Sequence, residues 1–135
     1  MPCHVLLVED STLVTDALTI LLESAGHVVR VAASAADAIA LGTGTRAQLM
    51  LLDLSLPDGD GLSVLATLRD AGAEPAITVA LTGHDDPSVR ERCLAAGCRD
   101  VLVKPVPARE LLARVAEWAE EIGRASEVGG GKSKV

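Results

Sequence analysis

Short apolar runs alternate with segments of helical periodicity along most of this 135-residue chain. The apolar runs, which predict β-strands, lie at 4–8, 28–31, 48–53, 77–81 and 101–103. The helical segments lie at 13–25, 35–41 and 61–71, between Asp86-Pro87 and Gly97, and at 108–122. A helix between two strands returns the chain to the edge where the first strand began, so the strands run parallel with right-handed crossovers. The alternation therefore predicts an α/β fold with helices on both faces of a parallel sheet.

The order of the strands follows from their number and composition. The run at 48–53 contains Leu-Met-Leu-Leu, which is typical of a central strand buried on both faces, whereas Arg30 between valines indicates an edge strand. Five strands, each followed by a helix, fit the doubly wound, flavodoxin-like order 2-1-3-4-5 with five helices. Binding sites in such sheets lie at the carboxyl ends of the strands, near the switch between strands 1 and 3.

Polar residues stand at four of these strand ends. Glu9 and Asp10 follow the first strand, Asp53 ends the third, Thr82 ends the fourth and Lys104 follows the fifth. Carboxylates that are gathered closely repel one another strongly. A hard divalent cation removes this repulsion, and Mg²⁺ suits a few carboxylates together with water and a phosphate. The strand ends therefore predict a Mg²⁺ site.

Each of these residues has an ordinary structural explanation when it is taken alone. Asp10, followed by Ser11 and Thr12, is a common way to begin a helix. Acids and threonines in loops are often turn formers or solvated side chains. Their joint occurrence at four ends of one sheet favours a functional site instead.

The motifs at the strand ends resemble the receiver domain of bacterial two-component response regulators, of the kind represented by chemotaxis regulators. The resemblance spans residues 3–122. It depends on four motifs in order: Leu7-Val8-Glu9-Asp10, Asp53 with Pro57 and Gly61, Ala80-Leu81-Thr82-Gly83, and Lys104-Pro105. It implies a phosphoacceptor that catalyses its own phosphorylation and slow dephosphorylation, and not an enzyme with turnover.

The resemblance also implies a role for each acidic residue. Asp53 would attack the phosphorus of a phosphohistidine or a small phosphodonor and become an aspartyl phosphate. Asp10 would bind Mg²⁺ directly, and Glu9 would act mainly through bound water. Asp53 itself and the backbone carbonyl of Ser55 would complete the metal ligands.

The other motif residues would, by the same resemblance, contact the phosphoryl group or shape its surroundings. Lys104 would pair with one phosphoryl oxygen, and Thr82 would donate its hydroxyl to another. Pro105 would follow a cis peptide bond. Many receivers carry Tyr or Phe where this chain has Val101, so we expect the conformational change to be transmitted less strongly to the last helix.

Two alternatives would use a similar pocket differently. A phosphatase of the haloacid dehalogenase class needs a second Asp two positions after its nucleophile, where this chain has Ser55. A degenerate receiver, which binds partners without phosphorylation, would have lost Asp10, Asp53, Thr82 or Lys104, and all four are present. The degenerate receiver stays open as an alternative for how the signal is read.

Composition sets limits on partners and location. The formal net charge of −7 argues against a nucleic-acid-binding surface. The chain has no signal peptide or apolar run of membrane-spanning length, and its three cysteines lack framework spacing, so a cytoplasmic protein is expected. The expected partners are a sensor histidine kinase or phosphotransfer protein of a phosphorelay, and an unknown downstream protein.

The length predicts one domain. Residues 1–122 would form the receiver domain, and the glycine-rich segment 123–135 would be a flexible tail or the stub of a linker. A stand-alone regulator and a receiver taken from a longer chain, such as a hybrid kinase, are both open.

Overall fold

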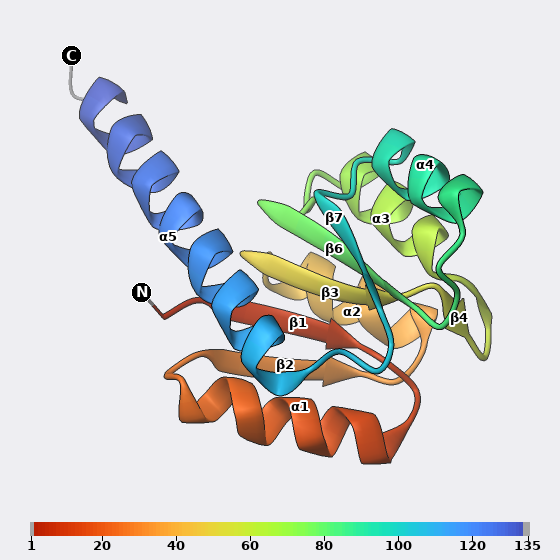
Figure 1. The fold of residues 1–135 in the computed structure, drawn as a ribbon. Helices are drawn as coiled ribbons and strands as arrows, with labels where there is room; N and C mark the ends of the chain where they lie inside the picture. The colour runs from red at the N-terminus through yellow and green to blue at the C-terminus, as the bar shows by residue number, and fades with distance from the viewer. Residues whose placement is uncertain (1, 134–135) are drawn as a thin grey trace.

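The structure is a computed structural model that describes residues 2–133, with side chains described as far as Ala125. Five parallel strands form one sheet in the order β2-β1-β3-β6-β7 (Figure 1). The strands are β1 (His4–Val8), β2 (Val28–Ala32), β3 (Leu49–Asp53), β6 (Ile77–Thr82) and β7 (Asp100–Val103). Counting only these five, the order is 2-1-3-4-5, so the flavodoxin-like fold is confirmed, with β2 and its Arg30 at one edge.

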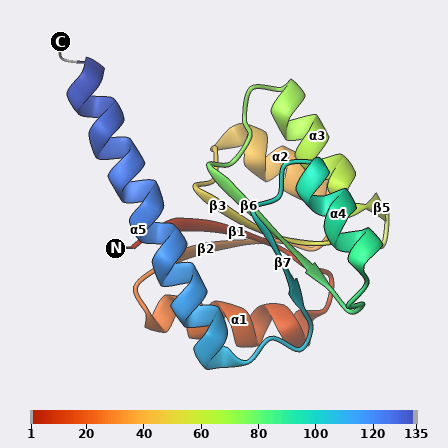
Figure 2. The same ribbon diagram turned by 45° about the horizontal axis from the view of Figure 1, so that its top comes forward.

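Helices cover both faces of the sheet, with α1 and α5 on one face and α2, α3 and α4 on the other (Figure 2). Their bounds are α1 (Thr12–Ser24), α2 (Ala35–Gly44), α3 (Gly61–Asp70), α4 (Pro87–Ala95) and α5 (Ala108–Ser133). Alternate residues of a strand point to opposite faces, so Leu6 packs with the α2–α3–α4 layer and Leu7 with the α1–α5 layer. Every residue of β3 is buried, as expected for a central strand with helices on both sides.

The residues that predict the start and the end of α4 have these roles in the structure. The Asp86 side chain accepts the Ser88 N–H (2.9 Å) at the N-cap, and Pro87 occupies the first helical position, where an N–H is not needed. Gly97 ends the helix with a φ of +108°, a conformation that other residues adopt at a cost. The Cys98 N–H then donates to the carbonyl oxygen of Cys93 (3.0 Å), which completes a glycine-terminated cap.

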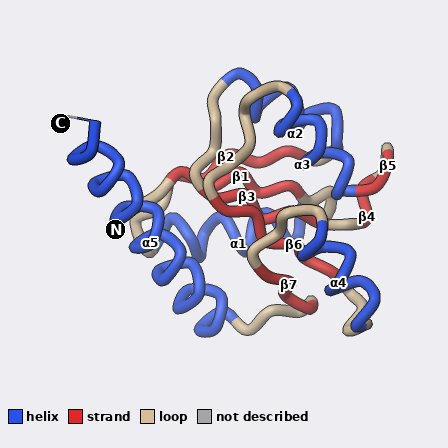
Figure 3. Tube along the Cα trace, turned by 90° about the horizontal axis from the view of Figure 1, so that it is seen from above, coloured by secondary structure: helices blue, strands red, loops and turns tan. Residues whose placement is uncertain are grey.

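The segment after β3 contains a short antiparallel hairpin that we did not predict. Its strands are β4 (Ser55–Leu56) and β5 (Gly59–Asp60), joined through Pro57-Asp58. The hairpin lies on the opposite side of the molecule from the C-terminal end of α5 (Figure 3). A Pro-Asp-Gly sequence favours a turn for known physical reasons, so the turn of this hairpin could have been predicted from the sequence.

The last helix is longer than predicted, since the predicted end at Ile122 lies inside α5. The segment expected to be a flexible tail is therefore helical as far as Ser133 in the part of the chain that the structure describes. Gly123 costs a helix only about 1 kcal/mol relative to Ala, and the good helix formers Arg124 and Ala125 follow it. A linker function for this segment stays a prediction.

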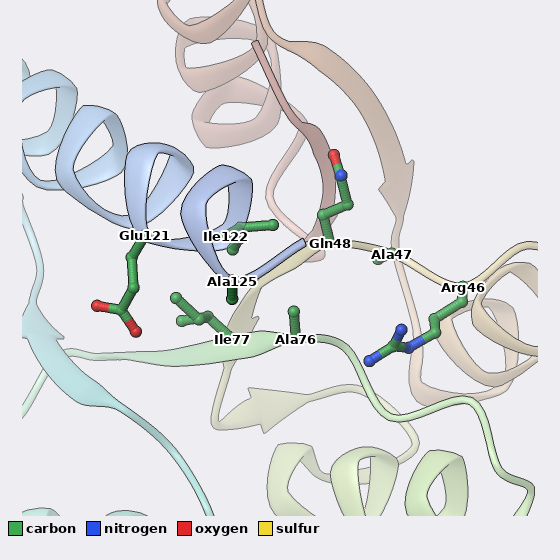
Figure 4. A pocket seen from close by; sticks show the side chains of 8 residues that line it. All are labelled: Arg46, Ala47, Gln48, Ala76, Ile77, Glu121, Ile122 and Ala125. Atoms are coloured by element: carbon green, nitrogen blue, oxygen red, sulfur yellow. The ribbon is translucent and has the colours of Figure 1, made fainter. Parts of the chain in front are cut away.

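A pocket of about 470 Å³ lies under α5 at the amino end of the sheet (Figure 4). Ile122 and Ala125 of α5 line it together with Ile77 at the start of β6. The pocket is thus at the end of the sheet opposite to the predicted site. Within residues 2–133, no helix is both long and apolar enough to span a membrane.

Candidate functional site

The predicted site residues meet at the carboxyl edge of the sheet because β1, β3, β6 and β7 are parallel and adjacent. Asp53 is the last residue of β3 and Thr82 the last of β6. Glu9 directly follows β1, and Lys104 directly follows β7. The fold therefore brings residues from four separate strands to one place, as the strand-end rule predicts.

Three carboxylates form an acidic cluster at this edge. Glu9, Asp10 and Asp53 each offer an oxygen, and these three oxygens lie within 4.8 Å of one another. Glu9 and Asp53 are only 2% and 3% exposed, whereas Asp10 is exposed at the mouth of the cluster. Oxygen donors of this kind, with one side open to water, fit a hard divalent cation such as Mg²⁺.

Lys104 reaches into the cluster and joins its two buried members. Its Nζ lies 3.1 Å from Asp53 Oδ2 and 3.2 Å from Glu9 Oε2. Burial lowers the pKa of Lys104, but the hydrogen bonds to Asp53 and Glu9 outweigh this and raise it above its usual value. The ammonium therefore stays charged, and one positive charge faces two carboxyl groups.

The two buried carboxyl groups differ in their affinity for a proton. Burial, followed by the neighbouring Asp53, raises the pKa of Glu9 to about 7. Burial also acts to raise the pKa of Asp53, but hydrogen bonds from Glu9, the Ser55 N–H and Lys104 outweigh it and lower that pKa. Glu9 is thus the group that takes up a proton as the pH falls through about 7, whereas Asp53 stays ionised.

This arrangement predicts how stability depends on pH when Mg²⁺ is absent. The pKa of Glu9 in the folded protein, about 7, exceeds its usual 4.5, so its stabilising contribution is complete below pH 4.5 and is lost as the pH rises through 7. We expect the contribution of Glu9 to the free energy of unfolding in EDTA to fall between about pH 5 and about pH 8. The lowered pKa of Asp53 acts only at lower pH and leaves this interval unaffected.

Urea unfolding across that interval measures the effect. Glu9→Gln cannot ionise and is expected to remove this contribution, so that its slope differs from that of the wild type. Glu23→Gln is the matched control, because Glu23 is exposed on α1, and it is expected to retain the slope. Identical slopes in wild type and Glu9→Gln would show that Glu9 does not hold the proton.

Ser55 and Thr82 complete the surroundings of Asp53. The Ser55 N–H donates to Asp53 Oδ1 (2.9 Å), so the backbone of Ser55 lies beside the acidic cluster. Thr82 is buried, and its hydroxyl oxygen accepts the N–H of His84 (3.1 Å). That bond uses an acceptor position, which leaves the hydroxyl hydrogen available for a group placed at the edge of the sheet. The peptide bond between Lys104 and Pro105 is cis, as the resemblance implies.

Two residues of the β3–α3 segment make close contacts near the site that we did not predict. Gly61 was noted only for its spacing from Asp53, but a Cβ at this position would overlap the backbone oxygen of Asp53 and lie 3.0 Å from the Cα of Leu54. Asp58 was overlooked, although its carboxylate binds two backbone N–H groups at the start of α2. The Pro57-Asp58-Gly59 turn signal could have drawn attention to it.

Comparison with known proteins agrees with this geometry. A sequence family described as "Response regulator receiver domain" matches residues 5–116. The transcriptional regulatory protein HprR of Escherichia coli is 39% identical over 111 residues, which cover 82% of this chain and 49% of that protein. The tetrathionate response regulatory protein TtrR of Salmonella typhimurium is 38% identical over 107 residues, covering 79% and 52%. The chain thus spans about half the length of the curated relatives that it matches.

Solved structures show the same fold. The receiver domain of a putative LuxO repressor protein from Vibrio parahaemolyticus superposes with a TM-score of 0.87 at 26% identity, covering 95% of this chain and 98% of that one. A CheY-like response regulator receiver domain protein from Methanospirillum hungatei gives a TM-score of 0.82 at 27% identity, with coverages of 93% and 99%.

Proposed function

This chain belongs to the response regulator receiver domain family of two-component systems, and we propose that it accepts a phosphoryl group on Asp53 with the help of Mg²⁺. The observation that carries the proposal is the state of Asp53. Its carboxylate is buried and ionised, and it is held between the Ser55 N–H and the Lys104 ammonium beside two further acids. A buried but charged oxygen at the sheet edge is suited to attack phosphorus.

The proposed transfer uses the chain's own residues as follows. An Asp53 oxygen forms a bond to the phosphorus of a phosphohistidine or an acyl phosphate, and the bond from phosphorus to the donor breaks. Lys104 then exchanges its contact with Asp53 for an oxygen of the arriving phosphoryl group and balances its charge. Because the Lys104 ammonium already lies beside Asp53, this exchange needs little movement of the chain.

The acidic cluster is the proposed Mg²⁺ site. Asp10 and Asp53, with the backbone carbonyl of Ser55, would hold the ion, and Glu9 would act through bound water. When bound, Mg²⁺ supplies positive charge that offsets both the carboxylates and the phosphoryl oxygens. The chain then does not have to bring two anions together against their repulsion.

Thr82 is the proposed link between phosphorylation and a change of shape. Only the phosphorylated protein offers its hydroxyl a phosphoryl oxygen, so Thr82 gains a contact that the unphosphorylated form lacks, and its movement perturbs the adjacent loop from Gly83 to Asp86. Val101 is buried on β7 next to this strand and can repack when Thr82 moves. Its small side chain couples less buried area to the change than an aromatic ring would.

The family implies partners on both sides of the transfer. We propose that a sensor histidine kinase or phosphotransfer protein supplies the phosphoryl group, and that the switched receiver, within residues 1–122, controls a downstream protein. HprR and TtrR are named as regulatory proteins, and this chain covers about half of each. α5, which continues beyond the receiver region, is the proposed connection to such an output partner.

A small phosphodonor tests the proposed function. With acetyl phosphate and Mg²⁺ we expect one phosphoryl adduct in the intact mass spectrum, and with EDTA we expect none. Asp10→Asn is expected to need about tenfold more Mg²⁺ for the same adduct, because it removes a direct ligand.

Asp16→Asn is the matched control, since Asp16 is exposed on α1 outside the acidic cluster. It is expected to behave as wild type. An adduct of equal yield in EDTA would contradict the proposed use of Mg²⁺, and no adduct under any condition would favour a degenerate receiver.

A further inference from the structure

The start of α2 is capped by a residue from a distant part of the chain. The first backbone N–H groups of a helix have no carbonyl partner inside it. Ser34, the N-cap of α2, accepts the N–H of Asp37 with its hydroxyl (3.1 Å). The N–H groups of Ala35 and Ala36 donate instead to the carboxylate of Asp58, at 2.7 Å and 3.0 Å to its two oxygens.

Asp58 holds these two groups from the tip of the β4–β5 hairpin. The hairpin pairs Ser55 with Asp60 and Leu56 with Gly59, so Pro57 and Asp58 form its turn. Both carboxylate oxygens are used, and the two N–H groups lower the pKa of Asp58. A carboxylate at a helix N-terminus also interacts favourably with the helix dipole.

The same hairpin carries part of the phosphorylation site at its base. Ser55, the first residue of β4, donates its N–H to Asp53 Oδ1 (2.9 Å). The base is tied to the sheet, because the Leu54 N–H donates to the carbonyl of Leu81 (3.1 Å). Among described contacts, the hairpin also forms an ion pair at its base, where Asp60, the partner of Ser55, lies 3.8 Å from Arg92, and both of these side chains are half-exposed. Of these two polar contacts, the bidentate bond from Asp58 to α2 is therefore the stronger, and it is the one that holds the tip.

We propose that Asp58 is a positioning residue for the phosphorylation site. By clamping the hairpin tip to α2, it keeps the backbone of Ser55 beside Asp53, where the Ser55 carbonyl would serve as a Mg²⁺ ligand. Asp58 touches neither the ion nor the phosphoryl group and acts through Ser55. The inference rests on the proposed function, since it assigns the clamp to the Mg²⁺ site described there.

A Mg²⁺ titration followed by the backbone amide chemical shifts of Asp10, Asp53 and Ser55 tests the clamp. Asp58→Ala is expected to raise the Mg²⁺ dissociation constant about tenfold, as loss of supporting contacts around metal ligands commonly does. Asp58→Asn keeps the shape and one acceptor oxygen and is expected to have an intermediate effect. It also serves as the variant of choice if Asp58→Ala does not fold.

Ser34→Ala is the matched control. It also removes one cap from the start of α2, but Ser34 has no contact with the hairpin among the hydrogen bonds of the described residues. We expect Ser34→Ala to bind Mg²⁺ as wild type does and to leave hydrogen exchange at the Ser55 amide unchanged, whereas Asp58→Ala accelerates that exchange. Mg²⁺ affinity and exchange at the Ser55 amide therefore distinguish positioning of the site by Asp58 from a general stabilisation of α2.

Failure of the clamp and failure of the proposed function give different results. Wild-type Mg²⁺ affinity in the folded Asp58 variants would overturn the clamp and leave the proposed function intact. Equal weakening by Ser34→Ala and Asp58→Ala would also overturn it, because the stability of α2 would then explain both. Absence of Mg²⁺-dependent shifts in the wild type would overturn the proposed function, and the clamp with it.

Discussion

Asp53→Asn is expected to abolish the phosphoryl adduct that acetyl phosphate forms with the wild-type protein. The amide lacks the negative charge that makes the carboxylate a nucleophile, and the other carboxylates of the acidic cluster lack the combined contacts with Ser55 and Lys104. The fold is expected to survive, because Asn has nearly the same shape and its oxygen can still accept the Ser55 N–H. Intact-mass measurement in the presence of Mg²⁺ decides the result.

Asp60→Asn is the control for this experiment. Asp60 lies in the β4–β5 hairpin that follows Asp53, and it caps α3 by accepting the N–H of Leu62 (3.0 Å), which Asn does equally well. It is expected to be phosphorylated as wild type is. An undiminished adduct on Asp53→Asn would place the acceptor on another residue, which peptide mapping would identify.

Gly61→Ala is expected to lower the free energy of unfolding by about 3 kcal/mol, at the upper end of the usual cost of overpacking. A Cβ on residue 61 would overlap the backbone oxygen of Asp53, and the atoms around it belong to backbone that cannot rotate away. Relief of the overlap has to move the end of β3 or the start of α3. Because the moved residue is the proposed phosphoacceptor, the yield of the adduct is expected to fall as well.

Gly44→Ala is the matched control for this substitution. A Cβ on Gly44, in the last turn of α2, would meet nothing within 4 Å, and Gly44 has no positive φ. It is expected to be neutral or to stabilise the protein by up to about 1 kcal/mol through helix propensity. Urea unfolding compares the two variants. Equal stability of Gly61→Ala and Gly44→Ala would mean that the β3–α3 turn is more adaptable than its close packing indicates.

The sheet and the composition of the site could be predicted from local sequence patterns. Apolar runs such as 49–52 are long enough for a strand and are followed by helical segments. A parallel sheet is then the arrangement that buries both kinds of element. Once the strands are parallel, their carboxyl ends share one edge. Glu9, Asp53, Thr82 and Lys104 therefore meet without any knowledge of side-chain contacts.

The extent of the last helix could not be predicted in this way. Gly123 and the glycines after it have low helix propensity, which led to an expected end at Ile122. Propensity is a weak guide over a few residues, and the rest of α5 provides a formed helix from which each further turn can extend cheaply. The β4–β5 hairpin was missed for a different reason, because its strands of two residues each are too short to show a period.

By itself the sequence determined which residues reach the carboxyl edge of the sheet, because strand and helix periodicity are local properties of the chain. Only the tertiary structure decided how those residues interact. Lys104 joins Glu9 from 95 positions away, and Asp58 caps α2 across 22 and 23 positions. Such bonds depend on how the helices and the hairpin pack on the sheet to within a fraction of an ångström, and the proton held by Glu9 depends on the burial that this packing creates.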